Sequence, residues 1–139
     1  MINVIDITPL KKISTYGGDV LHGLKKSDSS FKDFGEAYFS IIESGAIKAW
    51  KRHLRMTLNL IVPVGNVRFV FIGESNDTHE FNIGENNYAR VTVPPNIWFG
   101  FQGLSKGSSL VLNISDIEHD PNEVQRKKVS DINYDWNEK

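Results

Sequence analysis

Short apolar segments separated by turn-forming residues recur along the chain, and they constrain its fold more than any other feature of the sequence. Each is four to eleven residues long, and glycine, proline, asparagine, aspartate or serine fills the gaps. The segments are Ile2–Ile7, Ala37–Ile42, Ala46–Ala49, Leu54–Val64, Val67–Ile72, Ala89–Val93, Trp98–Phe101 and Leu110–Ile114. Their length and spacing predict an all-β sandwich or barrel.

Two turn signals and one short helix signal punctuate this pattern. Pro63–Asn66 separates two strongly apolar runs and predicts a hairpin turn. Pro94–Asn96 predicts the end of a strand, because its two prolines cannot donate to a ladder. Asp120–Arg126 is the best helix candidate, with aspartate as the cap and proline in the first turn. Near the end of the chain, three alternating side chains are placed to pack back on the body: Ile132, Tyr134 and Trp136.

Composition limits the classes of function. At 139 residues the chain fits one domain, residues 1–139, and its 40% hydrophobic and 24% charged content is ordinary for a globular protein. A net charge of −1 argues against nucleic acid or an anionic membrane as a partner. The lack of cysteine excludes disulfides, thiolate catalysis and cysteine-ligated metals. With neither a secretory start nor an apolar run of membrane-spanning length, we expect a cytoplasmic protein.

The stretch Ile47–Val62 alternates over much of its length and is interpreted as one long strand. One side carries Lys51, His53, Arg55, Thr57 and Asn59, and the other carries Arg52, Leu54, Met56, Leu58 and Leu60. No acidic residue occurs between Glu43 and Glu74. The polar row is therefore a candidate site, in a barrel mouth, for an anion such as a phosphate or a carboxylate. The alternative is an outward, solvated sheet face.

Lys51 has two opposing interpretations. If the barrel mouth is partly dry, its pKa is lowered, and the neutral amine can remove a proton alpha to a ketone. In the simpler reading it stays charged and holds a phosphate, a role also open to Lys48, His53 and Arg55.

The histidines do not predict a metal centre. They are His22, His53, His79 and His119. A metal-binding barrel of this kind needs two histidines spaced by one residue, a nearby carboxylate and a third histidine on a later strand. Only His53 lies on a well-defined strand, and Lys51 occupies the place of the second histidine, where its ammonium group would repel a cation. We therefore expect neither a metal nor another cofactor.

Aromatic and acidic side chains supply further candidates. Tyr38, Tyr88, Trp50 and Trp98 can stack on a base or a sugar, or can belong to the core. The residues Asp116, Glu118, His119 and Asp120 crowd a loop after the last strong strand, either as a functional cluster or as solvated turns and caps.

Four motifs follow one another in order from residue 45 to residue 136: Gly45–Lys51, Val64–Val67, Thr92–Phe101 and Ser130–Trp136. They resemble the G-V-L-R-G-L-H strand, the R-G-E-V hairpin, the W-I-P-P-G-F-A-H-G-F segment and the D-P-x-x-x-I-x-W ending of the cupin-fold sugar-nucleotide epimerases typified by dTDP-4-dehydrorhamnose 3,5-epimerase. The resemblance implies a cupin-type double-stranded β-helix, that is, a jelly-roll barrel with little helix. It also implies a nucleotide-sugar ligand and a homodimer.

The residues that the family uses for catalysis are changed here. In the family the histidine of R-G-L-H is the general base, assisted by an aspartate, and a tyrosine in the later E-F-L-Y strand donates the proton. The resemblance places Lys51 at that histidine, Lys48 at the arginine, Leu112 at the tyrosine and Phe99 at the histidine that follows the two prolines. The chain looks closer to a branch of short cupins that share a W-K-x-H-x-x-M-T-x-N-L strand.

From this resemblance we predict an epimerase or isomerase that acts on a nucleotide-activated 4-keto-6-deoxysugar for a cell-surface polysaccharide. Lys51 or His53 would remove the proton alpha to the ketone, and Tyr38 or Tyr88 would return one. The candidate substrate-binding residues are Lys48, Arg55, Asn59, Tyr88 and Trp98. Two alternatives remain open: a 3,4-ketoisomerase, and a non-catalytic cupin that binds the same sugar nucleotide.

Overall fold

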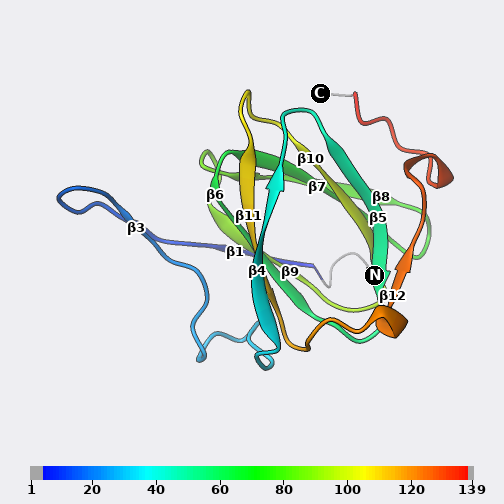
Figure 1. The fold of residues 1–139 in the computed structure, drawn as a ribbon, viewed down its shortest axis with the longest axis horizontal. Helices are drawn as coiled ribbons and strands as arrows, with labels where there is room; N and C mark the ends of the chain where they lie inside the picture. The colour runs from blue at the N-terminus through cyan, green and yellow to red at the C-terminus, as the bar shows by residue number, and fades with distance from the viewer. Residues whose placement is uncertain (1–4, 138–139) are drawn as a thin grey trace.

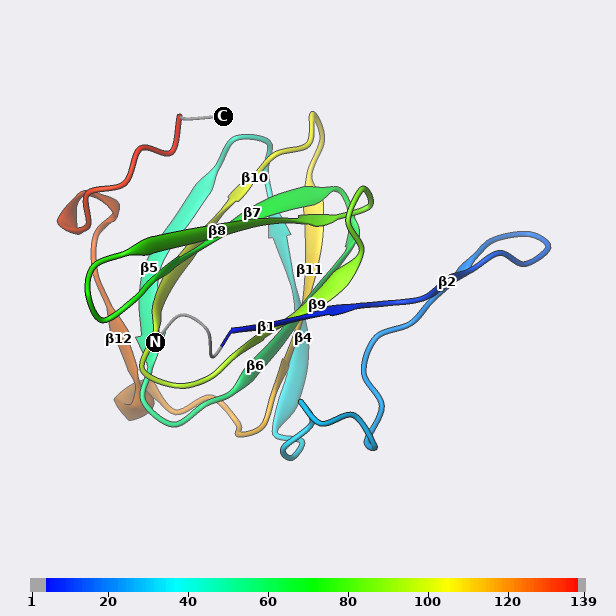
Figure 2. The same ribbon diagram turned by 180° about the vertical axis from the view of Figure 1, so that it is seen from behind.

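The computed structural model describes residues 5–137, which form two five-stranded sheets and a two-stranded arm (Figure 1). Sheet I has the order β1 (Asp6–Pro9), β9 (Ala89–Val93), β6 (Leu58–Val64), β11 (Ser109–Ser115) and β4 (Glu36–Ile42). Sheet II has the order β12 (Val124–Arg126), β5 (Ile47–His53), β10 (Trp98–Gly103), β7 (Asn66–Ile72) and β8 (Thr78–Gly84). The arm consists of β2 (Lys12–Ile13) and β3 (Val20–Leu21), and Figure 2 shows it projecting from the barrel.

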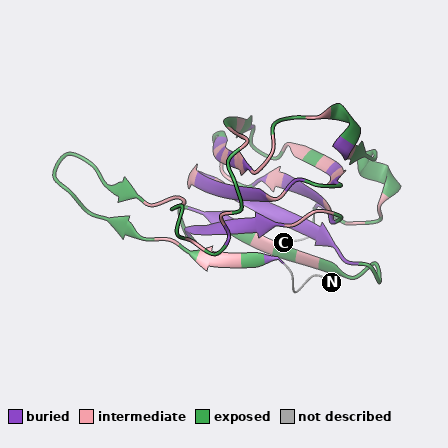
Figure 3. Ribbon diagram, turned by 90° about the horizontal axis from the view of Figure 1, so that it is seen from below, coloured by how far each residue is buried: buried purple, intermediate pink, exposed green. Residues whose placement is uncertain are grey.

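One apolar core joins the inner faces of the two sheets. Leu58, Leu60 and Val91 of sheet I meet Phe69 and Phe99 of sheet II in this core. Figure 3 shows buried strands in the body of the molecule and an exposed arm. Helix is limited, within residues 5–137, to the 3₁₀ turns η2 (Pro121–Glu123) and η3 (Val129–Asp131). The prediction of an all-β barrel with little helix is confirmed.

The prediction of one strand over Ile47–Val62 is wrong. β5 ends at His53 in sheet II, and β6 begins at Leu58 in sheet I. The four residues between them turn a corner, where the backbone N–H of Leu54 donates to the Glu123 carbonyl and that of Thr57 donates to the Asp116 carboxylate. The alternating pattern continues through this corner although the strand does not. Leu54, on the apolar side of the predicted strand, is 37% exposed as a result.

The turn at Pro63–Asn66 and the end of the strand at Pro94–Asn96 are both present, but the first is not a hairpin. It connects β6 to β7, and these strands belong to different sheets. Gly65 carries the turn with φ of 85°, a conformation that favours glycine. Around Pro94–Asn96, β9 ends at Val93 and β10 begins at Trp98.

The C-terminal tail covers the outer face of sheet II, as its alternating side chains predict. Ile132, Tyr134 and Trp136 pack against a cluster around Trp50, and the ring centroids of Trp50 and Trp136 are 5.3 Å apart. The indole N–H of Trp50 donates to the Val129 carbonyl at 3.1 Å.

At the other end of the chain, positions 2–4 of the first predicted apolar segment lie outside the described residues, and β1 begins just after them. Residues 5–137 contain no helix of the length and apolar character needed to cross a membrane.

Candidate functional site

His53 and Glu123 form a buried pair at the edge of sheet II. His53 ends β5, and η2 and β12 bring Glu123 beside it, because Val124 is paired with His53 across the β12–β5 ladder. The Nδ1 atom of His53 lies 2.5 Å from Oε1 of Glu123. The other carboxylate oxygen accepts the backbone N–H groups of Arg55 and Met56, both at 3.2 Å. Both oxygens of Glu123 are therefore engaged, and the imidazole is held by its Nδ1 side.

A short capped turn positions this carboxylate. The side chain of Asp120 accepts the backbone N–H of Asn122, and proline follows at the start of η2. This confirms the predicted cap, although the turn is a single 3₁₀ turn and continues as β12 rather than as a helix.

The surroundings favour a neutral imidazole with a free Nε2. Burial lowers the pKa of His53, and this effect outweighs the hydrogen bond and negative charge of Glu123, which raise it. Burial opposes ionisation of Glu123, but the hydrogen bonds from His53 and from two backbone amides outweigh it and lower the pKa of the carboxyl group. An ionised carboxylate accepts Nδ1–H, which leaves the lone pair on Nε2. The Nε2 atom is buried and makes no hydrogen bond with the described residues.

A cavity of about 350 Å³ lies beside this pair, between β4 of sheet I and the β5, β10 and β12 strands of sheet II. Its lining residues are Ser40, Lys48, Ala49, Trp50, Lys51, Phe99, Phe101, Arg126 and Lys127. The imidazole lies next to one lining residue, with a ring centroid 6.4 Å from that of Phe99. Four of the lining residues are cationic and none is acidic. The lining therefore favours an anionic ligand.

Lys51 has the partly buried environment that one of its two interpretations from the sequence requires. Its pKa is lowered, first by burial and then by the charges of Arg126 and Lys48. Arg126 is paired with Lys51 across the β12–β5 ladder, so the two cations are neighbours. An anion between them would relieve this repulsion.

Tyr38 approaches the cavity from the opposite sheet. It lies on β4, and because side chains alternate along a strand it shares the face of Ser40, which lines the cavity. Burial raises the pKa of its phenol, and the charge of Glu36 raises it further. Tyr38 therefore stays protonated near neutral pH and can serve as a proton donor.

The structure thus places two predicted site residues, Lys48 and Lys51, in the lining of one cavity. Two others, His53 and Tyr38, lie near enough to the lining residue Arg126 for its charge to affect their pKa values. The ammonium group of Lys48 also donates to the Ile41 carbonyl at 3.1 Å, across the gap between β5 and β4.

Four other predicted site residues lie elsewhere. Arg55 sits in the corner after β5, where its 58% exposed side chain pairs with Asp120 at 2.8 Å. Asn59 is buried on the outer face of sheet I, donates to the Ser30 carbonyl and accepts from Thr92.

Tyr88 precedes β9 and donates its hydroxyl to the His22 carbonyl at 2.7 Å. Trp98 is on the outer face of sheet II, where Arg52 and Lys127 both contact its ring, at 4.9 Å and 4.7 Å from the ring centroid.

Four charged or polar residues of this site were not predicted as site residues from the sequence: Glu123, Arg126, Lys127 and Ser40. The capping pattern at Asp120 located the turn that holds Glu123, but nothing in the sequence showed that this turn meets β5. The resemblance placed Leu112 at the proton donor. On β11, however, Leu112 pairs with Phe39 on the outer face, and its neighbour Asn113 is the residue that points inward.

Within residues 5–137, no group of three or more potential metal-ligating side chains converges on a point.

Known proteins share both the fold and part of the sequence. No protein-family model matches the chain. The probable low-salt glycan biosynthesis epimerase Agl13 of Haloferax volcanii is 30% identical over 112 residues, which cover 73% of this chain and 72% of the relative. A dTDP sugar isomerase from Desulfovibrio desulfuricans G20 superposes with a TM-score of 0.90 at 33% identity, over 96% of this chain and 90% of that one.

A third comparison extends to the type enzyme of the resemblance. The dTDP-4-dehydrorhamnose 3,5-epimerase of Sulfolobus tokodaii superposes with a TM-score of 0.80 at 17% identity, over 94% of this chain and 80% of that one. At this identity the likeness concerns the fold, which is the cupin-type jelly roll. The identity to the Haloferax epimerase, across more than two thirds of both proteins, and the shared barrel show that the chain belongs to the cupin-fold sugar-nucleotide epimerase family.

Proposed function

We propose that the protein is an epimerase that acts on a nucleotide-activated 4-keto-6-deoxysugar, with His53 as its general base. The single observation that carries this proposal is the His53–Glu123 pair beside a cationic cavity. The names of the similar proteins, a glycan biosynthesis epimerase and a dTDP sugar isomerase, support the ligand class and a role in glycan biosynthesis.

The chemistry follows from the acidity of a C–H bond next to a ketone. The Nε2 atom of His53 takes the proton alpha to C4, and the electron pair of the C–H bond moves to the carbonyl oxygen to give an enolate. Cationic side chains stabilise that charge and the diphosphate of the substrate: Lys48, Lys51 and Arg126. Glu123 holds the imidazole in the tautomer that presents Nε2 and stabilises the imidazolium that forms.

The positions of base and donor favour epimerisation over ketoisomerisation. Inversion at carbon needs a proton removed from one face of the sugar and another delivered to the opposite face. His53 lies on β5 of sheet II and Tyr38 on β4 of sheet I, the two sheets that contribute to the cavity lining. Tyr38 protonates the enolate, and solvent then restores the phenol and removes the extra proton from His53.

The non-catalytic alternative accounts less well for the buried pair. A buried polar atom without a partner costs free energy, and Nε2 of His53 is such an atom among the described residues. A ligand that only bound could satisfy this atom with one hydrogen bond, whereas a general base also requires a partner that orients the imidazole from Nδ1, as Glu123 does.

We also propose a homodimer, formed through the outer face of sheet I beside β4. Phe39 pairs with Leu112, and Ile41 pairs with Leu110, so these side chains share one face. Phe39 is 64% exposed, Ile41 63% and Val64 50%. A contiguous apolar patch of this kind is typical of an isologous interface between two copies. A monomer in sedimentation equilibrium, with no change on Ile41→Glu substitution, would contradict the proposal.

Incubation with dTDP-4-keto-6-deoxyglucose in heavy water separates the three functions. Epimerisation places deuterium at C3, C5 or both, with inversion. Ketoisomerisation removes the proton at C3, moves the carbonyl there and places deuterium at C4, and mere binding labels no carbon. NMR spectra of the sugar that show inverted, deuterated carbon support the proposal, and an unlabelled sugar recovered from a mixture in which binding is demonstrated refutes it.

A further inference from the structure

We propose that the protein carries a second anion site, for a phosphate group, at the base of its arm. A cavity of about 250 Å³ lies there between the outer face of sheet I and the two chain segments that lead into and out of the arm. Its lining residues are Thr8, Pro9, Leu10, Lys11, His22, Gly23, Leu24, Lys25, Asp28 and Arg90. It shares none of them with the catalytic cavity, and the inference does not depend on the proposed function.

Arg90 is the centre of this site. It lies on β9, paired with Thr8 of β1, and its side chain is 4% exposed. Its Nη1 atom donates to the Gly23 carbonyl at 2.7 Å and lies 3.3 Å from the Asp28 carboxylate. Its Nε atom is buried and makes no hydrogen bond with the described residues. The guanidinium is therefore held through Nη1, and its Nε–H group keeps the capacity to donate a hydrogen bond.

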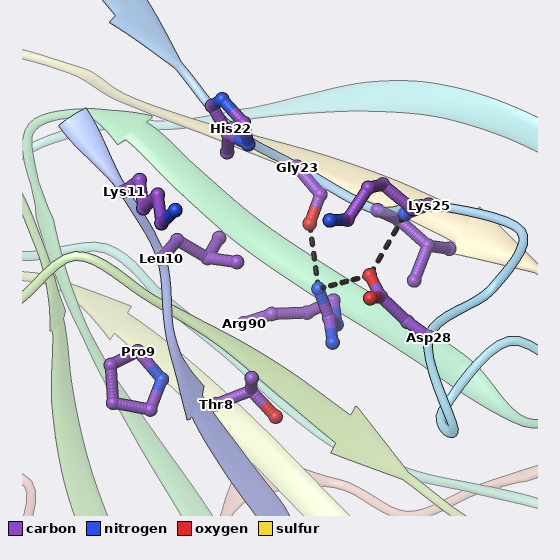
Figure 4. A pocket seen from close by; sticks show the side chains of 10 residues that line it. Thr8, Pro9, Leu10, Lys11, His22, Gly23, Lys25, Asp28 and Arg90 are labelled. Atoms are coloured by element: carbon purple, nitrogen blue, oxygen red, sulfur yellow. Dashed lines mark hydrogen bonds and ion pairs between the residues drawn. The ribbon is translucent and has the colours of Figure 1, made fainter. Parts of the chain in front are cut away.

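The charges of the lining are unbalanced. Three cations, Arg90, Lys11 and Lys25, face one carboxylate, that of Asp28. Asp28 is shared as well, because its carboxylate also accepts the backbone N–H of Lys25 at 2.8 Å. Figure 4 shows Arg90 below Gly23 and beside Asp28, with Lys11 and Lys25 on opposite sides of the opening. A water molecule can satisfy a free N–H group, whereas an anion can satisfy it and also compensate the positive charge of the lining.

A phosphate group fits these properties. It offers several acceptor oxygens and about two negative charges, which suits an arginine fork with two lysines as point charges. The cavity is smaller than the usual 300–1,000 Å³ of a site for a whole drug-sized ligand. It therefore suits inorganic phosphate or the phosphate end of a small metabolite, with Pro9, Leu10 and Leu24 as an apolar wall. The bound group would tie both segments of the arm base to the barrel.

His22 lines the cavity and provides a local reporter. We would titrate inorganic phosphate into the Lys48→Gln/Lys51→Gln protein at fixed pH and ionic strength, so that two cations of the catalytic cavity are absent. The His22 imidazole signals, assigned by a His22→Gln variant, are followed by NMR. Saturable shifts at His22 are expected. Adding Lys11→Gln and Lys25→Gln should weaken the affinity roughly tenfold, since each removes a charge-assisted contact.

The matched control adds Lys32→Gln and Lys106→Gln, which removes two exposed lysines that line neither cavity. It should leave the affinity unchanged. Arg90→Lys keeps the charge but not the planar fork, and should weaken binding in a folded protein. A hexose 1-phosphate run in parallel identifies the source of the phosphate: tighter binding than inorganic phosphate indicates a metabolite, and equal or weaker binding indicates the free ion. Non-saturating shifts with both probes, or equal weakening in the control, would overturn the proposal.

Discussion

The imidazole of His53 and the carboxylate of Glu123 meet at 2.5 Å although 70 positions separate them in the sequence. The pairing of β12 with β5 brings them together, so the proposed catalytic pair depends on an edge strand of three residues. The same carboxylate holds the backbone at the corner after β5. The residue that orients the base thus also helps to form the corner at which the chain passes from one sheet to the other.

Replacing Glu123 with Gln should lower kcat roughly a hundredfold, because the imidazole loses the carboxylate that fixes its tautomer. Glu123 raises the pKa of His53, so the acid limb of the kcat/KM profile should also move to lower pH. A purely structural role would lower activity without moving this limb. Glu118→Gln, on an exposed residue of the same connection, is the matched control.

Tyr38→Phe should separate proton removal from inversion. Without the phenol, the enolate still forms at His53 and collects deuterium from heavy water, but nothing delivers a proton from the β4 side. NMR of the recovered sugar should show deuterium with retained configuration. The rate of inversion should fall about a hundredfold or more. Inversion at the wild-type rate would assign the donor to another residue.

Acid should weaken the fold through His53. Its pKa in the folded protein lies below the ordinary value of 6.5. Below pH 6.5 the unfolded chain therefore takes up a proton before the folded protein does, and stability falls as the pH drops through the folded pKa. Urea unfolding at pH 7 and pH 5.5 should show a loss of up to about 1.4 kcal/mol per pH unit from this group.

The variant His53→Asn should flatten this dependence, and His119→Asn, on an exposed residue, should not. The lowered pKa of Glu123 acts in the same direction, but its window begins below 4.5 and lies outside the measured range. Equal slopes for wild type and His53→Asn would contradict the assignment.

The tail should contribute to stability through Trp136. This side chain is 6% exposed and packs on Trp50, while its carbonyl accepts a hydrogen bond from Arg68 at 3.1 Å. Trp136→Ala should cost about 3 kcal/mol in denaturant unfolding, because it opens a cavity against sheet II. Tyr16→Ala, at a fully exposed position on the arm, should change stability by less than about 0.5 kcal/mol.

The barrel could be predicted because it depends on local signals. Apolar runs between turn residues set the strands, and Asp120 with Pro121 set the short turn before Glu123. The prediction that five polar residues line one face of a single strand was wrong for an equally local reason. Alternation of polar and apolar residues cannot distinguish a strand from a corner that continues the same pattern. Arg55 and Asn59 lie outside the cavity, because the chain passes from sheet II to sheet I between β5 and β6.

The remaining features are set by tertiary pairing. Trp98 faces outward because of its place in β10, next to an irregular step in the pairing with β5 between Phe99 and Gly100. The contact between Glu123 and His53 depends on the pairing of β12 with β5 at the edge of sheet II. No sequence signal near Glu123 specifies that pairing. The resemblance supplied the barrel and the ligand class. Its alignment placed Lys51 at the position of the family's base, and the sequence left both Lys51 and His53 as candidates for proton removal.

The comparison that decides between these two residues is the rate of solvent deuterium incorporation into dTDP-4-keto-6-deoxyglucose at saturating sugar, for His53→Asn and Lys51→Gln. If His53 is the base, His53→Asn slows incorporation by about 10²- to 10⁴-fold, the contribution of a general base. Lys51→Gln then weakens binding but retains incorporation, and His79→Asn behaves as wild type. Incorporation that survives in His53→Asn and disappears in Lys51→Gln would make Lys51 the base and contradict the account.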